Sequence, residues 1–577
     1  MTNRARPANT PPSSALETFV LGVVGAVVAA GAVLWLGAQA ASLVRNRHPL
    51  DLDAEAVALA LRHLPATMGN PRLAFAQPFR GQLPGPIVFW PCLLLALGVA
   101  GSFAYGLWRV FRSERTPLDR RTRLGVGAEA RLATARDLKP LMVGRPRPGR
   151  FVLGRFRRHL LAAENPAAAS RRRRWRGDIG SIALIGPSRS GKTRCAQAGI
   201  RHWRQPAILS SVKTDLLAST VEDRRRLGEV KVFDPTGVTG MTSAHWTPLR
   251  AAGSLQGAAA TAKALVDAAP RGERSSDSHW LKQAEILLTS LLWLAANSEK
   301  RTISDVVDWV LGLDRPTDDS SGTVGPLLRA HVESADKALS ASAVRVHRWM
   351  KGLWELDPRT SSSVYATAPT AIWPWADPDV AAVSEGCDID LDWLLRETNT
   401  LYHATPLADQ DRLAPVLGGL IADLVNQAFE RVSRVRRRLD PTLLLVLDEA
   451  ANTPVRKLPE WASTVAGIGI QLVTVWQSKS QLEAIYGAQA DTILTNHLTK
   501  LFFTGMSDAA GLEYVGRLSG YEHVPGYLGS DKPDAAGRVT PTQVALLAPN
   551  VVRQIRPGDA LLVHGTLPPA HVRPSKA

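Results

Sequence analysis

Cysteine is scarce in this chain, whose 577 residues contain three, at positions 92, 195 and 387. Their wide separation excludes a disulfide framework and a cysteine-based zinc site, and it is typical of a protein in a reducing compartment. Cys195 follows a glycine-rich loop, and we interpret it as a small helix residue rather than a nucleophile.

Charge is absent from two long stretches, Thr18–Val44 and Gly81–Trp108. Each holds an apolar core of about 20 residues, which is enough to cross a bilayer. Residues 38–40 resemble a signal-peptide cleavage site, but the first apolar run is too long for a typical secretory signal. We therefore predict a cytoplasmic tail over 1–17, membrane helices over 18–44 and 86–110, and an extracytoplasmic loop over 45–85.

Positive charge gathers directly after the second apolar stretch. The net charge is +17, and residues 109–177 hold twenty Arg or Lys against five acids, a balance of +15. This bias obeys the positive-inside rule, so the large C-terminal part is predicted to be cytoplasmic. We interpret 111–177 as a basic juxtamembrane linker that binds anionic lipid headgroups in preference to nucleic acid.

One glycine-rich loop carries the clearest motif of the chain. It follows an apolar, strand-like run and fits the phosphate-binding P-loop at every fixed position. Its residues are Gly186, Pro187, Ser188, Arg189, Ser190, Gly191, Lys192 and Thr193. Backbone N–H groups of such a loop converge on phosphates, and the following helix adds the positive end of its dipole. We predict that Lys192 reaches the β- and γ-phosphates and that the Thr193 hydroxyl ligates Mg²⁺. The predicted cofactors are ATP and Mg²⁺.

A second motif completes the predicted nucleotide site. The run LLLVLDEA (443–450) is typical of a buried strand that ends in two carboxylates. Asp448 can hold Mg²⁺ and Glu449 can polarise the attacking water as a general base. Gln477, after another apolar run, is predicted to sense the γ-phosphate, with a simple capping role as the alternative. The predicted catalytic residues are Lys192, Asp448, Glu449 and Gln477, and the predicted metal ligands are Thr193 and Asp448.

Strand and helix patterns alternate on both sides of a long helical segment. Strand-like runs occupy 182–186, 207–210, 230–234, 400–406, 443–450, 470–478, 500–506 and 560–565. Such alternation is typical of a parallel sheet covered by helices, whereas the intervening segment shows a 3.6-residue period. The fold class is therefore α/β. We predict a nucleotide-binding domain in two parts, 178–253 and 397–577, interrupted by an all-α domain over 254–396.

These motifs resemble those of the type IV secretion coupling proteins, the TraG/TraD-like group of conjugative ATPases. The resemblance rests on GPSRSGKT, SSVKTDL (210–216), VFDPTG (232–237), LLLVLDEAAN (443–452) and VTVWQSKSQLEAIYG (473–487), together with the two apolar stretches. It implies a RecA-like fold with an inserted all-α domain behind two transmembrane helices in a bacterial cell membrane. It also implies a homo-hexamer that hydrolyses ATP to move single-stranded DNA and its relaxase into a type IV secretion channel.

The resemblance leaves two residue roles open. Lys213, in SSVKTDL, lies either near the nucleotide or in a solvated loop. Many family members carry an arginine before the strand that ends at Gln477, where it reaches a neighbouring subunit, but 463–471 has none here. Arg456 or Arg517 would have to supply it.

Two other functions are compatible with the motifs. A septal-type DNA translocase shares the nucleotide site, although such pumps usually lack so large a helical insertion. A membrane scaffold that binds ATP without hydrolysing it and recruits protein cargo to a secretion channel would also keep the P-loop.

Overall fold

The computed structural model describes residues 15–111, 122–124, 126–127, 129–163, 180–270, 278–314, 322–452, 455–527 and 539–575. The chain divides into two compact units. The first comprises Met1–Glu129 and His523–Gln543, and the second comprises Ala130–Glu522 and Val544–Ala577.

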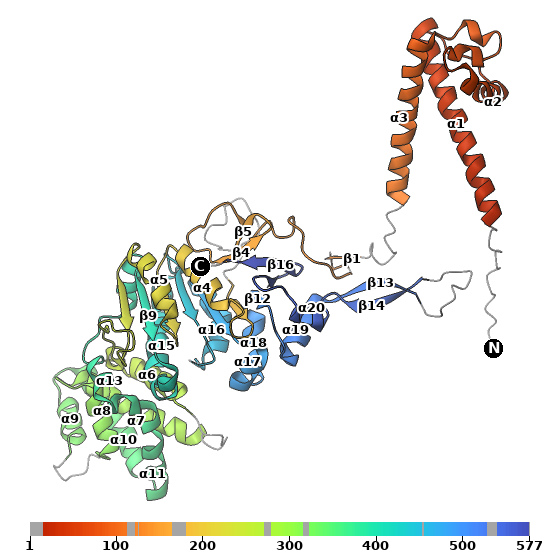
Figure 1. The fold of residues 1–577 in the computed structure, drawn as a ribbon. Coiled ribbons are helices and arrows are strands. Elements are labelled where there is room, and N and C mark those ends of the chain that lie inside the picture. Colours follow the sequence, from red (N-terminus) through yellow and green to blue (C-terminus); the bar gives the residue numbers. More distant parts are fainter. Residues whose placement is uncertain are drawn as a thin grey trace, which may run out of the picture. The chain divides into compact units, whose positions relative to one another are not determined.

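The first unit is built on two long apolar helices, α1 (Ala15–Asn46) and α3 (Pro86–Phe111), which pack against each other (Figure 1). Within them, Gly25–Asn46 and Pro86–Gly106 are long and apolar enough to cross a membrane. Close packing is possible because Gly37 has no side chain, and a Cβ there would lie 2.7 Å from Leu93 Cδ1. The unit also contains the short antiparallel pair β1 (Thr122–Arg123) and β2 (Val126–Gly127).

The connection between α1 and α3 is folded. It contains α2 (Ala54–His63) and three 3₁₀ turns, η1 (Leu64–Thr67), η2 (Pro71–Ala74) and η3 (Phe79–Gly81). The Gln39 amide donates to the carbonyl of Leu50 at 2.6 Å and accepts from its N–H at 2.8 Å. The Arg45 guanidinium donates to Leu83 O at 2.8 Å. These bonds satisfy backbone groups at the helix ends, so this segment is a small folded cap.

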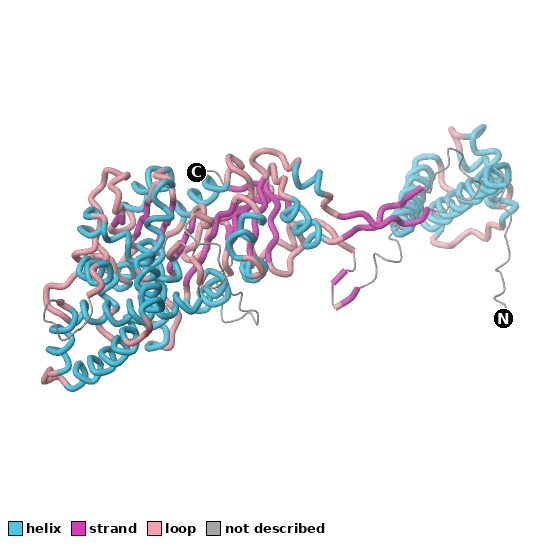
Figure 2. Tube along the Cα trace, turned by 90° about the horizontal axis from the view of Figure 1, so that it is seen from below, coloured by secondary structure: helices cyan, strands magenta, loops and turns pink. Residues whose placement is uncertain are grey.

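The second unit is organised by one twelve-stranded sheet, in the order β3-β5-β4-β16-β15-β12-β6-β11-β10-β7-β9-β8. Its seven-stranded parallel part consists of β12 (Thr499–Phe503), β6 (Ile182–Ile185), β11 (Ile470–Trp476), β10 (Leu443–Leu447), β7 (Ala207–Ser211), β9 (Thr400–Ala404) and β8 (Val230–Phe233). Figure 2 shows these strands between helices. The α/β fold class predicted from the sequence is therefore confirmed.

The parallel strands are continuous apolar runs because both of their faces are buried. Leu443–Leu447 is buried throughout, with Leu445 in the core on one face and Leu444 in the core on the other. Both helical layers follow from this pattern. One face is covered by α4 (Lys192–His202) and α5 (Asp215–Arg225), and the other by α15 (Gln410–Val435), α16 (Leu458–Ile468), α17 (Lys479–Tyr486) and α18 (Gln489–Asn496).

The remaining five strands are antiparallel, and of these only β15 was predicted from the sequence, as the run 560–565. They are β3 (Met142–Val143), β4 (Val152–Phe156), β5 (His159–Ala162), β15 (Ala560–His564) and β16 (Ala570–Pro574). Three of them fall within 111–177, the segment predicted as a linker, and β16 follows the strand predicted as the last. The region packs because Phe151 is buried against α4 at Gly199, where a Cβ would lie 2.1 Å from the Phe151 ring. The arginine-rich stretch 171–176 lies outside the described residues.

Residues 254–396 form the all-helical insertion, with no strand among those that the structure describes. Its helices are α6 (Leu255–Ala268), α7 (Ser278–Asn297), α8 (Ile303–Leu311), α9 (Val324–Val332), α10 (Lys337–Trp354), α11 (Pro358–Thr367), α12 (Pro369–Ile372), α13 (Pro378–Ala382) and α14 (Leu391–Arg396), with η5 (Pro248–Ala251) before them and η7 (Trp373–Ala376) among them. Helix α6 packs on α7 and on α15, so the insertion and the sheet share one hydrophobic core. Beyond β12 lie α19 (Ala509–Ser519), α20 (Pro549–Arg553) and the hairpin of β13 (Tyr521–Tyr527) and β14 (Val539–Ala545), and η8 (Leu407–Asp409) precedes α15.

Candidate nucleotide site

The P-loop lies between the buried strand β6 and the first turn of α4. Strand β6 ends at Ile185 and α4 begins at Lys192, so Gly186–Gly191 form the turn. Gly191 has a left-handed backbone (φ 102°) that favours glycine. A Cβ on Gly186 would lie 2.8 Å from Phe503 Cβ, so only glycine allows β12 to end this close to the loop. The fold therefore builds the loop geometry that the motif predicts.

The Lys192 side chain curls back into its own loop. Its ammonium donates to the carbonyls of Gly186 at 2.6 Å and Pro187 at 2.7 Å. Only 7 % of the residue is exposed. Burial lowers the pKa of Lys192 to about 8, against the opposing pull of Asp448 and Glu449. The loop thus holds a buried cation whose hydrogen-bond partners are backbone carbonyls, which a phosphate can replace.

Asp448 and Glu449 follow β10 at the carboxyl edge of the parallel strands. Asp448 accepts from Ser211 Oγ at 3.3 Å through Oδ2, whereas its buried Oδ1 has no partner. Burial raises the pKa of Asp448 to about 6, and the negative charge of Glu449 contributes to this rise. Glu449 has a left-handed backbone at φ 54°, which is unfavourable for a residue with a side chain. The buried carboxylate of Asp448 and the left-handed backbone of Glu449 both lower the stability of the folded protein, and such unfavourable features are common at functional sites.

Strand order brings Gln477 between the two motifs. Strand β11 pairs with β6 on one side and with β10 on the other, and Gly186 N donates to Trp476 O at 3.1 Å. Gln477 is the next residue and is exposed, with its N–H donating to Gln481 Oε1 at 3.1 Å. The residues predicted from the two motifs and from Gln477 therefore meet at one edge of the sheet.

Two further side chains hold Glu449, and neither had an assigned role from the sequence. Lys213 Nζ lies 3.2 Å from Glu449 Oε1, and Asn452 Nδ2 donates to Oε2 at 3.0 Å. Lys213 follows β7, which pairs with β10. The role of Lys213 could not be settled from sequence, because strand adjacency does not follow chain order. The only sequence feature that pointed to Asn452 was its place in the motif LLLVLDEAAN.

A cavity of about 250 Å³ adjoins the P-loop. It is lined by Arg189, Ser190, Gly191, Arg194, Phe503, Thr504, Pro557, Gly558, Pro574 and Ser575. The hydroxyl of Ser190 is buried without a partner. The P-loop and the start of α4 supply a polar, cationic side of the cavity, and the ends of β12 and β16 with the turn before β15 supply the other, so it offers space for part of a ligand held by the loop.

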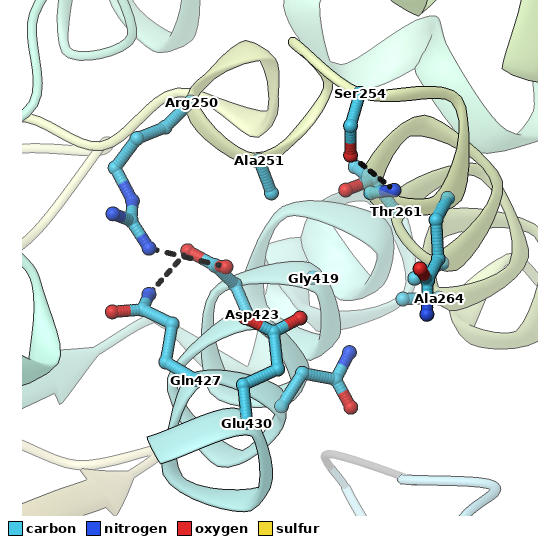
Figure 3. Close-up of a pocket in the computed structure, with 13 residues that line it drawn as sticks. Arg250, Ala251, Ser254, Thr261, Ala264, Gly419, Asp423, Gln427 and Glu430 are labelled. Carbon is cyan, nitrogen blue, oxygen red and sulfur yellow. Dashed lines mark hydrogen bonds and ion pairs between the residues drawn. The ribbon is translucent and has the colours of Figure 1, made fainter. Parts of the chain in front are cut away.

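A larger cavity, of about 520 Å³, lies between α6 and α15 and contains none of the predicted site residues (Figure 3). Its centre is Asp423, whose carboxylate accepts from Gln427 Nε2 at 3.0 Å and lies 3.5 Å from Arg250. Trp246 Nε1 also donates to Asp423, at 3.1 Å. These bonds satisfy the carboxylate from within the chain, and they tie the segment around η5, which precedes the helical insertion, to α15, which follows it.

Two remaining sequence interpretations can be placed. Cys195 is buried, and burial raises the pKa of its thiol to about 12, which suits a packing role. Arg517 lies on α19 and pairs with Glu513 of the same helix at 2.5 Å. Arg456 lies in the turn before α16. A contribution of either arginine to a neighbouring subunit stays a prediction.

The comparison with known protein families decides the family. The family model for conjugative DNA transfer by the type IV secretory system matches residues 155–574. The chain belongs to this family. The resemblance inferred from the motifs is therefore confirmed.

Among relatives in this coupling-protein family is the conjugal transfer protein TraG of Escherichia coli. It is 25% identical over 369 residues, covering 59% of this chain and 55% of TraG. The chain thus spans about half the length of this curated relative.

Solved coupling proteins share the fold. The bacterial conjugative coupling protein TrwBdeltaN70 aligns with 80% of this chain and 95% of its own, at a TM-score of 0.56 and 14% identity. TrwB in complex with ADP and Mg²⁺ aligns with 69% of this chain and 85% of its own, at a TM-score of 0.50 and 14% identity. At this identity the likeness shows the fold alone, and it confirms the RecA-like architecture.

Proposed function

We propose that this coupling-family protein binds and hydrolyses ATP at the edge formed by the P-loop and β10, and that hydrolysis drives conjugative transfer of single-stranded DNA. The observation that carries the proposal is the convergence of Lys192, Asp448 and Glu449 at one sheet edge, although 255 residues separate Thr193 from Asp448. The strand order β6-β11-β10 is the geometric basis of that proximity, because it places the ends of β6 and β10 one strand apart. TrwB, which shares the fold, has been solved with ADP and Mg²⁺.

The proposed Mg²⁺ ligands are Thr193 and Asp448. Asp448 Oδ1 is buried and unpartnered, which is costly unless a cation or an ordered water completes it. Carboxylate and hydroxyl oxygens are hard ligands that suit Mg²⁺. Bound Mg²⁺ would neutralise phosphate charge. The raised pKa of Asp448 fits this role, because a nearby cation would restore the ionised form.

Each remaining residue has a separate proposed task. Lys192 exchanges the Gly186 and Pro187 carbonyls for phosphate oxygens, and the N–H groups of the loop, including those of Ser188 and Arg189, face the phosphates. Glu449 takes the proton of the attacking water. Gln477, between the two motifs, senses the γ-phosphate.

The wider proposal places this motor below a membrane. Helices α1 and α3 span the bilayer, the cap between them is extracytoplasmic, and the second unit is cytoplasmic, consistent with the arginines that follow α3. The proposed assembly is a homo-hexamer that receives single-stranded DNA with its relaxase and passes them to type IV secretion channel proteins. Phosphate contacts would make DNA binding weaken with salt.

Equilibrium binding of Mg-ATP to the full-length chain tests the proposed site. Lys192→Met should weaken binding strongly, because a charge-assisted contact to phosphate is lost. The matched control is Lys500→Met. Lys500 is also 7 % exposed, burial also lowers its pKa to about 8, and its amine donates to a backbone carbonyl, that of His497. Equal effects of the two substitutions would contradict the proposal, since both would then report only the loss of a buried lysine.

A further inference from the structure

Both carboxylate oxygens of Glu449 are occupied in the structure. Lys213 Nζ lies 3.2 Å from Oε1, and Asn452 Nδ2 donates to Oε2 at 3.0 Å. A general base must direct an oxygen lone pair at its water, and contacts to neighbouring side chains decide where each oxygen points. In the structure the carboxylate of the proposed base is directed at Lys213 and Asn452.

The two contacts differ in how easily they break. Asn452 lies three residues after Glu449 in the same turn, so its contact is local. Lys213 comes from another strand, and its side chain is 62% exposed. Exposed ion pairs add little net stability, because water solvates the separated charges well. The Lys213 contact is consequently the one that a stronger anion can take over.

Lys213 also lies near the other charged groups of the site. Its positive charge adds to the fall in the pKa of Lys192 that burial causes, and it opposes the rise in the pKa of Asp448. The two lysines thus flank the two carboxylates, one from the P-loop after β6 and one from the loop after β7. In the order β6-β11-β10-β7, these loops lie on opposite sides of Asp448 and Glu449.

We propose that Lys213 is a positioning residue that pairs with Glu449 and transfers to the terminal phosphate when a nucleoside triphosphate binds. The transfer frees Glu449 Oε1, while Asn452 keeps the carboxylate oriented. The water oxygen then bonds to the γ-phosphorus as the bond from that phosphorus to the β–γ bridging oxygen breaks. Glu449 accepts the water proton, and ADP and inorganic phosphate are the products. A diphosphate lacks the group that attracts Lys213, so hydrolysis is coupled to recognition of the triphosphate.

This inference rests on the proposed function, and a binding measurement without turnover separates the two. The full-length chain is titrated with Mg-ADP and with Mg-ADPNP, a non-hydrolysable ATP analogue. Lys213→Met should weaken ADPNP binding about tenfold, as expected when a charge-assisted contact is lost, and change ADP binding less than about twofold. Lys213→Arg keeps the charge and should retain the preference for ADPNP.

The matched control is Lys263→Met. Lys263 is likewise half-exposed and paired with a carboxylate, Asp267 at 3.0 Å, but it lies on α6. This variant should bind both nucleotides like the unmodified chain. Equal weakening of ADP and ADPNP by Lys213→Met, or the same discrimination by Lys263→Met, would overturn the inference.

A second variant tests the exchange itself. Glu449→Gln removes the charge that competes for Lys213, so ADPNP should bind more tightly than to the unmodified chain, and adding Lys213→Met should abolish this gain. An unchanged ADPNP affinity in Glu449→Gln would contradict the exchange.

The Lys192→Met variant separates failure of the proposed site from failure of the Lys213 role. If Lys192→Met leaves the affinities for ADP and ADPNP unchanged, the proposed nucleotide site itself fails. If Lys192→Met weakens both while Lys213→Met does not discriminate, only the role of Lys213 fails.

Discussion

Replacing Asp448 by Asn should stabilise the nucleotide-free protein while weakening its binding of Mg-ATP. The carboxylate is 5 % exposed, and its Oδ1 has no partner. Burial and the neighbouring Glu449 disfavour its charge. An amide of the same shape removes that charge and keeps an acceptor for Ser211.

The magnitude follows from the pKa of Asp448, which rises from 3.8 to about 6. The folded chain keeps the Asp448 proton up to about pH 6, whereas the unfolded chain releases it near pH 3.8. The free energy of unfolding therefore falls as the pH rises between these two values. Two units correspond to at most about 3 kcal/mol at pH 7.5. At pH 5 the folded carboxyl is mostly protonated, so the stability advantage of the Asp448→Asn variant over the unmodified chain shrinks to about half.

Urea unfolding of the full-length chain in detergent, followed by tryptophan fluorescence without nucleotide or metal, measures this difference at both pH values. The stabilisation by Mg-ATP should fall in the variant at pH 7.5. A variant that is less stable than the unmodified chain at pH 7.5 would refute the reasoning, because Asp448 would then be a structural carboxylate.

Three further predictions concern packing, the loop and acid stability. Gly199→Ala should lower the unfolding free energy by about 1–3 kcal/mol, because its Cβ would lie 2.1 Å from the Phe151 ring, and an unchanged urea midpoint would show that Phe151 does not pack on α4. Gly186→Ala should impair Mg-ATP binding, since its Cβ would lie 2.8 Å from Phe503 Cβ, and unaltered affinity in a titration would contradict the loop geometry. Burial lowers the pKa of three histidines to about 4. Because the unfolded chain takes up these protons near pH 6.5 and the folded chain only near pH 4, the free energy of unfolding falls as the pH drops between these values, by about 2 kcal/mol for each histidine at pH 5. His→Gln variants should flatten that decline in pH-dependent unfolding; the positions are His403, His497 and His564.

The parallel core of the fold was predictable from the sequence because its strands are unbroken apolar runs that end in motif residues. The run LLLVLDEA indicates both a buried strand and its functional end, and the structure places β10 at 443–447. The helical insertion was predictable for the same reason, since its 3.6-residue period continues over many turns.

Apart from β15, the antiparallel edge was not predictable, because its strands carry no comparable signal. Strand β4 reads VLGRF and precedes Arg157 and Arg158, so the surrounding positive charge suggested a linker. Its place in the sheet depends on Gly199 of α4, 43 residues beyond the strand's end, which makes room for Phe151. Tertiary packing of this kind leaves no local pattern.

The candidate site was predictable in its residues but not in its internal contacts. Each motif names its own side chains, whereas the pairing of Lys213 with Glu449 depends on β7 lying next to β10. That adjacency joins residues 236 positions apart. Sequence spacing alone does not encode it.

Steady-state ATP turnover by the full-length chain in lipid, with and without single-stranded DNA, tests the central claim most directly. The unmodified chain should release phosphate, and DNA should raise the rate. Glu449→Gln should abolish turnover while retaining nucleotide binding, because the proton acceptor is removed and the P-loop contacts to phosphate remain. If the unmodified chain and Glu449→Gln are equally inactive with DNA present, the chain is an ATP-binding scaffold and the account of a hydrolytic motor is wrong.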